Sequence, residues 1–270
     1  MSWLESAVLG ILQGLTEFLP ISSSGHLVLG ENLLKVKLND ISFEVFPHFG
    51  TLLSVVIVFR KTIWGMINAV MEKAGVSFLK CDRADLTENW NLFWLIMLGS
   101  VPAGILGILF KKYVEKSFSS PHFVSIMLLI TGFILFLTKF VKETEGKIKF
   151  SDAFLIGIAQ AIAILPGISR SGFTISTGIF RKIQREKAAE FSFLLSLPAV
   201  LGATALKSKD LLNQSHPSFN LWFYLIGTFC AFLFGCVAIK FLLNVMRKGR
   251  FEFFGYYCFL IGILSFLFLK

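Results

Sequence analysis

Two segments of this chain repeat the same interrupted apolar pattern at a constant offset of 147 residues, the separation of Gly10 and Gly157. At that offset, Gly, Ile, Gln, Ile, Ser, Ser and Gly recur without a gap. Each segment is an apolar stretch that stops at a proline and a cluster of hydroxyl side chains. A break in a membrane helix exposes backbone polar groups, which must face protein or a water-filled cavity. The repeat therefore indicates where a binding or catalytic site lies.

The composition requires a membrane protein. Hydrophobic residues make up 55% of the 270 residues, charged residues 16%, and the mean hydropathy is +0.73. A water-soluble domain of this size needs more polar surface. We expect no cleavable signal peptide, because Glu5 and Glu17 interrupt the first apolar stretch. The net charge of +9 is spread over loops, which favours orientation among anionic lipids and speaks against nucleic-acid binding.

Six apolar runs are long enough to cross a bilayer, which takes roughly 17–25 residues. They are Phe43–Phe59, Leu92–Phe110, Phe123–Val141, Ala188–Leu206, Leu221–Leu243 and Phe253–Leu269. Two further regions, Trp3–Leu34 and Asp152–Phe180, each contain the break and predict a re-entrant helical hairpin; the alternative is a pair of spans with a proline kink. The expected fold is an all-α polytopic membrane protein, with one domain over residues 1–270 and half-repeats at about 1–150 and 151–270.

The order of elements predicts an inverted repeat. Each half is a hairpin followed by three spans, and because three is odd the second half starts on the opposite side. The tips Ile21–Gly25 and Gly167–Gly172 then enter from opposite faces and meet near the midplane. Of the 26 Lys and Arg residues, 17 fall on one side, 8 on the other, and Arg170 in a tip. The side with 17 should be cytoplasmic, so both termini and the first hairpin's opening face outside. The odd number of spans in each half requires that the amphipathic segment Thr62–Met71 lies at the cytoplasmic interface and does not cross the membrane.

The first tip combines groups suited to phosphate chemistry. Glu17 is an acid in an apolar helix, where a charge usually faces a cavity or a partner. Gln13 lies four residues earlier on the same helix face, so the two provide half of a Mg²⁺ or Ca²⁺ site. Ser23 and His26 are spaced for a Ser–His contact, and a neutral imidazole can accept a proton from a serine or a water. Simple pairing of Glu17 with Arg170 is the alternative.

The second tip carries the cation. Arg170 offers a planar fork of donors that matches phosphate oxygens. The helix that returns from this tip begins near Ser171, and its free N–H groups favour an anion. We expect the remaining substrate-binding groups at the two tips to be Ser22, Ser24, Gly25, Ser169, Ser171, Gly172 and Thr174. Glu44 and His48 either line the same cavity or lie near the interface.

These residues resemble a known family. The run Gln13–His26 is similar to the signature of undecaprenyl-diphosphatases of the bacitracin-resistance type, which reads Glu or Gln, three residues, Glu, then Phe-Leu-Pro-x-Ser-Ser-x-Gly-His. Pro166–Gly172 resembles the second motif of that family, and Phe191–Pro198 also resembles it. The resemblance covers nearly the whole chain. Gln13 stands where the pattern allows either residue, so a second carboxylate for a metal is missing.

The resemblance implies an enzyme that hydrolyses undecaprenyl diphosphate to undecaprenyl phosphate and phosphate at the outer face of the bacterial cytoplasmic membrane. This activity recycles the lipid carrier for cell-wall synthesis and confers bacitracin resistance. The resemblance implies Mg²⁺ or Ca²⁺ as cofactor and a catalytic set of Glu17, Ser23, His26 and Arg170. The expected partners are the polyprenyl diphosphate and membrane lipid, with no nucleic acid; a homodimer is one oligomeric state compatible with the sequence.

The residues leave the mechanism open at two points. With the cation on Glu17 and Gln13, and Arg170 on the phosphate, His26 activates either Ser23 or a water. Alternatively, Glu17 orients His26 and the phosphate itself holds most of the metal. A flippase or transporter of the polyprenyl phosphate is the rival function, because inverted repeats with broken helices are typical of transporters.

Overall fold

The computed structural model describes residues 3–34, 41–76, 82–118, 120–142, 145–212 and 221–268. Within these ranges the regular secondary structure is helical, with one isolated β-bridge between Gly146 and Ile183. The helices are α1 (Trp3–Phe18), α2 (Ser23–Leu34), α3 (Ile41–Val58), α4 (Arg60–Lys73), α5 (Arg83–Leu109), α6 (Lys111–Ser117), α7 (Pro121–Leu137), the 3-10 turn η1 (Thr138–Phe140), α8 (Phe150–Ile162), α9 (Arg170–Phe180), α10 (Arg185–Leu212), α11 (Leu221–Arg247) and α12 (Phe253–Phe268).

The chain is a multi-pass membrane protein. Among the described residues, four helical segments are long and apolar enough to cross a bilayer, namely Arg83–Leu109, Pro121–Phe140, Arg185–Ala205 and Trp222–Arg247. The bent pair of α3 and α4 is a fifth candidate. Six full spans were predicted, and the difference lies in α3 and α12. The 16 residues of α12 are fewer than the roughly 20 that span the hydrocarbon core upright, and Leu269, the last residue of that predicted run, lies outside the described residues.

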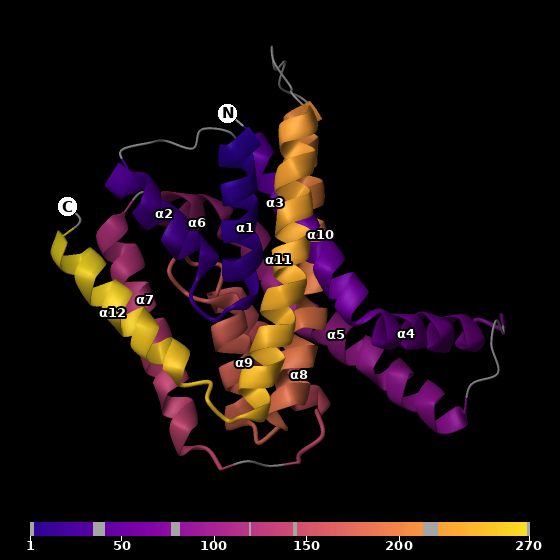
Figure 1. Ribbon diagram of the computed structural model, residues 1–270. Coiled ribbons are helices and arrows are strands. Elements are labelled where there is room, and N and C mark those ends of the chain that lie inside the picture. The colour runs from indigo at the N-terminus through magenta and orange to yellow at the C-terminus, as the bar shows by residue number, and fades with distance from the viewer. Residues whose placement is uncertain are drawn as a thin grey trace.

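Helix α4 does not continue the direction of α3. The two axes differ by 79° at their junction, and α4 runs outward from the bundle beside α5 (Figure 1). Thr62 at its start donates a hydrogen bond of 2.9 Å to Glu190 of α10, which anchors the bend. Trp64 and Ile67 on α4 remain exposed. Thr62–Met71 therefore lies in a helix separate from α3, and its place at the cytoplasmic interface stays a prediction.

Both predicted helix breaks are present, and a serine occupies the same capping position in each. Residues 19–22 separate α1 from α2, and residues 163–169 separate α8 from α9. At the first break, the Ser22 hydroxyl accepts a hydrogen bond of 3.2 Å from the backbone N–H of Gly25. At the second, the Ser169 hydroxyl accepts one of 3.1 Å from Gly172. A serine thus caps each returning helix, as serine commonly does, so the repeat seen in the sequence is also a repeat in structure.

The first helix of each broken pair packs against a helix from the other half of the chain. Helix α1 lies along α11 (Figure 1), and α8 lies along α5. Glycines permit both contacts: a side chain at Gly10 would collide with the carbonyl of Gly227, and one at Gly157 with the carbonyl of Gly99. Small residues at helix contacts are typical of membrane bundles. The two halves are therefore interlocked.

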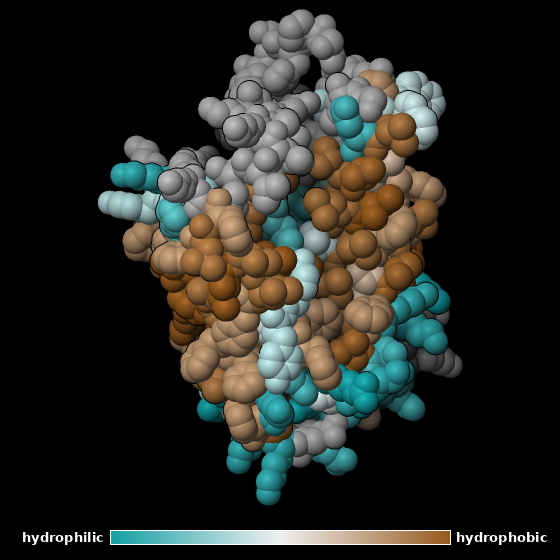
Figure 2. Space-filling model, turned by 60° about the vertical axis from the view of Figure 1, so that its left-hand side comes forward, coloured by the Kyte–Doolittle hydropathy of each residue, from teal (hydrophilic) through white to brown (hydrophobic). Residues whose placement is uncertain are grey.

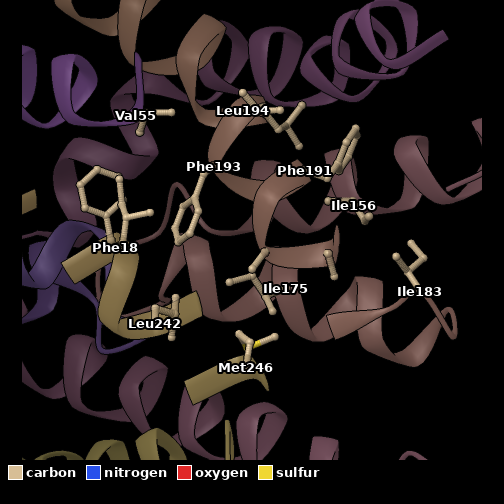
Figure 3. Packing of buried hydrophobic residues seen from close by; sticks show 14 of the residues in the cluster. Phe18, Val55, Ile156, Ile175, Ile183, Phe191, Phe193, Leu194, Leu242 and Met246 are labelled. Atoms are coloured by element: carbon tan, nitrogen blue, oxygen red, sulfur yellow. The ribbon is translucent and has the colours of Figure 1, made fainter. Parts of the chain in front are cut away.

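A buried aromatic contact holds the end of α1. Phe18 is 1% exposed, and its ring meets that of Phe193 on α10 edge to face, with centroids 5.5 Å apart. Figure 3 shows this pair among aliphatic side chains from several helices. Figure 2 shows one face of the molecule, where two broad apolar areas are divided by a paler strip and hydrophilic side chains gather at the lower edge and the upper left. The core therefore fixes Phe18, and with it the position of the neighbouring Glu17.

Candidate active site

The two helix breaks touch each other inside the protein. A side chain placed on Gly25 would lie 3.2 Å from the Cα of Gly167, and one on Gly172 would lie 3.4 Å from Pro20. Gly167 has φ +92°, a conformation that side chains disfavour, and its Cα faces the α7 backbone at Val124. The predicted meeting of the two tips is therefore present in the structure.

Polar groups from the flanking helices bind the backbone of each break. At the second break, the Thr131 hydroxyl donates to the carbonyl of Gly167 at 3.0 Å and accepts from the N–H of Ser169 at 3.2 Å. At the first, the Cys258 thiol lies 3.5 Å from the carbonyl of Pro20. Thr131 is on α7 and Cys258 is on α12. Non-helical backbone at membrane depth needs such protein partners, so the breaks are built features of the fold.

Glu17, in the last turn of α1, is the centre of the site. Its carboxylate Oε1 accepts a hydrogen bond of 2.6 Å from Nη2 of Arg170. Its Oε2 accepts from Nε2 of Gln13 at 2.8 Å and from the hydroxyl of Ser23 at 3.0 Å. The side chains of Glu17 and Arg170 are only 9% and 19% exposed. Four of the predicted site residues therefore form one connected, largely buried cluster, and the Glu17–Arg170 ion pair, which the sequence offered as the alternative, is present.

Ser23 and Arg170 occupy equivalent places in the repeat. Each is the first residue of the helix that returns from its break, and the offset of 147 residues relates them. Both side chains donate to the same carboxylate, Ser23 to Oε2 and Arg170 to Oε1. The N-termini of two helices thus converge on one point, and helix N-termini favour an anion. A phosphate that took the place of the carboxylate would meet the same donors.

The spacing predicted a contact between His26 and Ser23, but the imidazole has other partners in the structure. Its Nδ1 lies 2.9 Å from the carbonyl of Ser22, so Nδ1 carries the proton and donates. In the neutral ring Nε2 is then an acceptor, and the Tyr257 hydroxyl of α12 lies 2.8 Å from it. The two rings are also stacked, with centroids 5.6 Å apart. Because the first turn of α2 bonds the ring to its own Ser22 carbonyl, the imidazole is directed toward α12.

A second imidazole lies on the Glu17 side of the site. Nε2 of His48 is 3.3 Å from Nε2 of Gln13 and 3.9 Å from Oε2 of Glu17. The Gln13 amide therefore donates to both Glu17 and His48. The sequence left open whether His48 lines the cavity, and the structure places its ring beside Gln13 and Glu17. The side chain of Glu44, considered with it, lies outside the described residues.

The remaining predicted binding groups are mostly buried and bonded within the tips. Ser22 has φ +66° and contacts the Ser24 hydroxyl at 3.4 Å. Ser169 and Ser171 form the equivalent contact at 3.3 Å. Thr174 donates to the carbonyl of Arg170 at 2.7 Å and lies 2.6 Å from the hydroxyl of Ser192. These groups, with Gly25 and Gly172 at the caps, shape the tips, whereas Glu17, Ser23 and Arg170 form their polar contact.

Sequence reasoning missed Tyr257, Thr131 and the recess around Glu17. Tyr257 and Thr131 stand within long apolar runs, and a lone hydroxyl in a predicted span was the available signal. The recess is narrow and combines the ion pair with side chains of α3 and α10, among them Thr51, Ser196, Leu197 and Val200. Gln160, the repeat equivalent of Gln13, is buried with both amide atoms unbonded in the described structure. The second half therefore lacks an equivalent of the Glu17 carboxylate, because Ile164 stands 147 residues after Glu17.

The residues fit a divalent cation only in part. Among the described residues, no group of three or more His, Cys, Asp and Glu side chains is arranged to hold a metal ion. Glu17 offers a carboxylate, and Gln13 offers an amide oxygen if its side chain is turned over. Mg²⁺ in proteins commonly takes one or two carboxylates and completes its shell with water and substrate phosphates. The donor set therefore suits a cation that shares its ligands with a phosphate.

Comparison with known proteins gives matches over almost the full length. The family described as "Bacitracin resistance protein BacA" matches residues 6–264. The curated undecaprenyl-diphosphatase of Salinibacter ruber is 43% identical over 98% of both chains. That of Halothermothrix orenii is 42% identical over 95% of this chain and 94% of its own. That of Korarchaeum cryptofilum is 41% identical over 96% of both.

Proposed function

This chain belongs to the bacitracin resistance protein BacA family and is an undecaprenyl-diphosphatase, and we propose that it removes the terminal phosphate of undecaprenyl diphosphate at the outer face of the bacterial cytoplasmic membrane. One observation carries the assignment of the site. The carboxylate of Glu17, next to a helix break inside an apolar bundle, binds a guanidinium and a serine hydroxyl from two different helix starts. A cation, a hydroxyl and a proton acceptor at one point suit the hydrolysis of a diphosphate.

Arg170 binds and neutralises the terminal phosphate in this proposal. In the resting enzyme its guanidinium is paired with Glu17 at 2.6 Å, and together they occupy the narrow recess. The incoming diphosphate replaces the carboxylate as the partner of Arg170, and the N–H groups at the start of α9 add further donors. Charge that develops on the phosphoryl oxygens then meets donors that are already in place.

Ser23 is the better placed of the two nucleophile candidates. Its hydroxyl donates to Glu17, so the carboxylate can accept the serine proton as Oγ attacks phosphorus. The bond from phosphorus to the bridging oxygen breaks and prenyl phosphate leaves; water then hydrolyses the phosphoserine and releases phosphate. The alternative is direct attack by a water that Glu17 activates. Rapid quenching with phosphorus-labelled substrate separates the routes: label bound to Ser23 supports the covalent one, and its absence at every time point supports water.

His26 supplies a second proton-transfer group, and Tyr257 positions it. The Ser22 carbonyl and the Tyr257 hydroxyl hold the ring from both nitrogens, which fixes its tautomer and orientation. When the Tyr257 hydroxyl no longer donates to Nε2, this nitrogen can accept a proton from the phosphate or from the attacking group. In this arrangement Tyr257 acts through His26 and does not itself contact the reacting atoms.

Mg²⁺ or Ca²⁺ is the proposed cofactor. Glu17 and Gln13 would hold it together with the oxygens of the diphosphate, and when bound it supplies positive charge that offsets the charge of the phosphates. Release of Arg170 from Glu17 frees the carboxylate for this role. Chelation is therefore expected to abolish phosphate release by purified enzyme, and added Mg²⁺ or Ca²⁺ should restore it. Full activity in excess chelator would contradict the assignment.

The proposed topology has six crossings and two re-entrant hairpins in an inverted repeat. The reciprocal packing of α1 on α11 and of α8 on α5 supports it, as do the equivalent serine caps. Four basic loops lie at the same end of the molecule, because three contacts join them. Arg185 binds the carbonyl of Val141, Arg247 pairs with Glu186, and Thr62, near Arg60, binds Glu190. We assign this end to the cytoplasm. Lys35, Lys37, Lys80 and Lys270, which entered the charge count, lie outside the described residues.

Phosphate release tests hydrolysis against lipid flipping. Enzyme purified in detergent has no second compartment, so a flippase without hydrolytic activity releases nothing. We expect Mg²⁺-dependent release of phosphate from undecaprenyl diphosphate and about 10²-fold or greater loss in Glu17→Ala, His26→Ala and Arg170→Ala. Wild-type rates in all three variants would reject this site.

A further inference from the structure

An apolar cavity of about 300 Å³ lies between α4, α5 and α10. Every residue that lines it is apolar, and the lining includes Met66 and Met71 of α4, Met97 of α5, and Leu194, Leu197 and Pro198 of α10. Its existence depends on the bend of 79° after α3, since this bend directs α4 across the side of α5 and α10. Neither the repeat nor the hairpin motifs include this cavity.

The cavity adjoins the ionic site. Leu197 lines both the apolar cavity and the narrow recess that contains Glu17 and Arg170. On the neighbouring turn of α10, Ser196 and Val200 face the recess, whereas Leu194 and Pro198 face the cavity. One side chain therefore separates a site for charged groups from a space for apolar ones. A molecule whose charged head is joined directly to an apolar chain fits this arrangement, with the head in the recess and the chain in the cavity.

We propose that the cavity holds the first isoprene units of the substrate's polyprenyl chain while the diphosphate occupies the recess. The proposal rests on the function proposed above and adds a binding site for the tail. A diphosphate bound at Glu17 and Arg170 places its prenyl group within one side chain of an apolar space. The cavity gives that group a defined path past Leu197 and between α4 and α5.

The chemistry of the lining suits a branched, flexible chain. Met66, Met71 and Met97 have unbranched side chains that adapt their shape to an apolar ligand. The volume is at the small end of the range for ligand sites, roughly 300–1,000 Å³. The cavity therefore accommodates only the part of the chain nearest the head, and the remainder of the chain extends into lipid.

Filling the cavity tests the proposal. Met97→Trp from α5 and Val70→Phe from α4 narrow it from two walls, and Val101→Trp on the exposed face of α5, where Val101 is 48% exposed, is the matched control. Phosphate release is measured with undecaprenyl diphosphate and with a diphosphate carrying one isoprene unit. For the long substrate, kcat/KM should fall about tenfold or more in both filled variants, which corresponds to the loss of a modest apolar contact. The one-isoprene substrate and the control variant should stay within about twofold of wild type.

Photo-crosslinking provides a readout that does not depend on turnover. An undecaprenyl diphosphate with a diazirine on its second isoprene unit should label α4, α5 or α10 in the wild type, and this label should be lost in Met97→Trp. Label confined to other helices, unchanged kcat/KM for the long substrate in both filled variants, or equal losses on both substrates would each overturn the proposal. Absence of phosphate release from every substrate by wild-type enzyme would instead reject the proposed function, and the crosslink would still locate the tail.

Discussion

Neutralising Glu17 should destabilise the protein through Arg170, and removing Arg170 as well should restore much of the lost stability. In Glu17→Gln one carboxylate oxygen becomes an NH₂ donor. Whichever way the amide is oriented, this donor faces another donor: Arg170 at the Oε1 position, or Gln13 and Ser23 at Oε2. Both charged side chains are at least four-fifths buried. Removing one partner of such a pair costs about 3–5 kcal/mol, mostly because the other charge stays buried and unpaired.

The double variant separates this effect from ordinary damage. Arg170→Gln alone should also cost about 3–5 kcal/mol, because it leaves Glu17 unpaired. In Glu17→Gln with Arg170→Gln the two amides can bond each other and no unpaired charge stays buried, so the combined cost should fall well below that of either single change. The cycle therefore predicts a coupling free energy of at least about 3 kcal/mol, well above the roughly 0.5 kcal/mol expected for independent sites.

The assay is the free energy of unfolding in mixed micelles, measured together with phosphate release. Stability should recover in the double variant, whereas activity should remain about 10²-fold or more below wild type in all three. Stability losses that simply add would show that the ion pair does not form in the resting enzyme. Recovery of activity in the double variant would show that these side chains do not act on the substrate.

Three further predictions test other parts of the site. Ser23→Ala should lower kcat about 10²-fold or more with little change in stability. Ser22→Ala should chiefly lower stability, by about 1 kcal/mol, because it removes the cap of α2. The reverse pattern would reassign the nucleophile. Tyr257→Phe keeps the stacked ring but loses the bond to the imidazole, so kcat should fall with KM nearly unchanged, and a rise in KM alone would argue for substrate contact. Gly10→Ala should impair folding through collision with the facing helix, whereas Gly104→Ala, which has open space, should fold as wild type by fluorescence-detected gel filtration.

The sequence predicted the parts of the fold that depend on local chemistry. Proline and hydroxyl clusters end apolar helices because they withdraw or compete for backbone hydrogen bonds, and both breaks lie where the clusters stand. The constant offset carried the equivalence of Ser22 with Ser169, which the structure shows as two matching caps. The cost of an isolated charge in an apolar bundle indicated that Glu17 faces a cavity or a partner, and pairing with Arg170 was the alternative that the structure shows.

Features that depend on distant contacts were not predictable from one sequence. The orientation of His26 is set by Tyr257, which stands 231 residues away in an otherwise apolar helix. The position of His48 beside Gln13 depends on how α3 packs on α1, and a pattern of residue types does not report packing. The apolar cavity depends on the bend between α3 and α4, and the short length of the amphipathic segment was the only sign of that bend in the sequence.

The interlocked halves have a consequence for biosynthesis. The ribosome completes α1, with Glu17 at its end, long before it makes α11, whose Gly227 backbone receives the glycine surface of α1. In the nascent protein that surface still lacks α11 as its partner, and the carboxylate has no Arg170 to neutralise it. Assembly of the catalytic groups therefore has to be completed after translation has passed α11, and a chain truncated after α10 would carry all four predicted catalytic residues without the helix that holds the first of them in place.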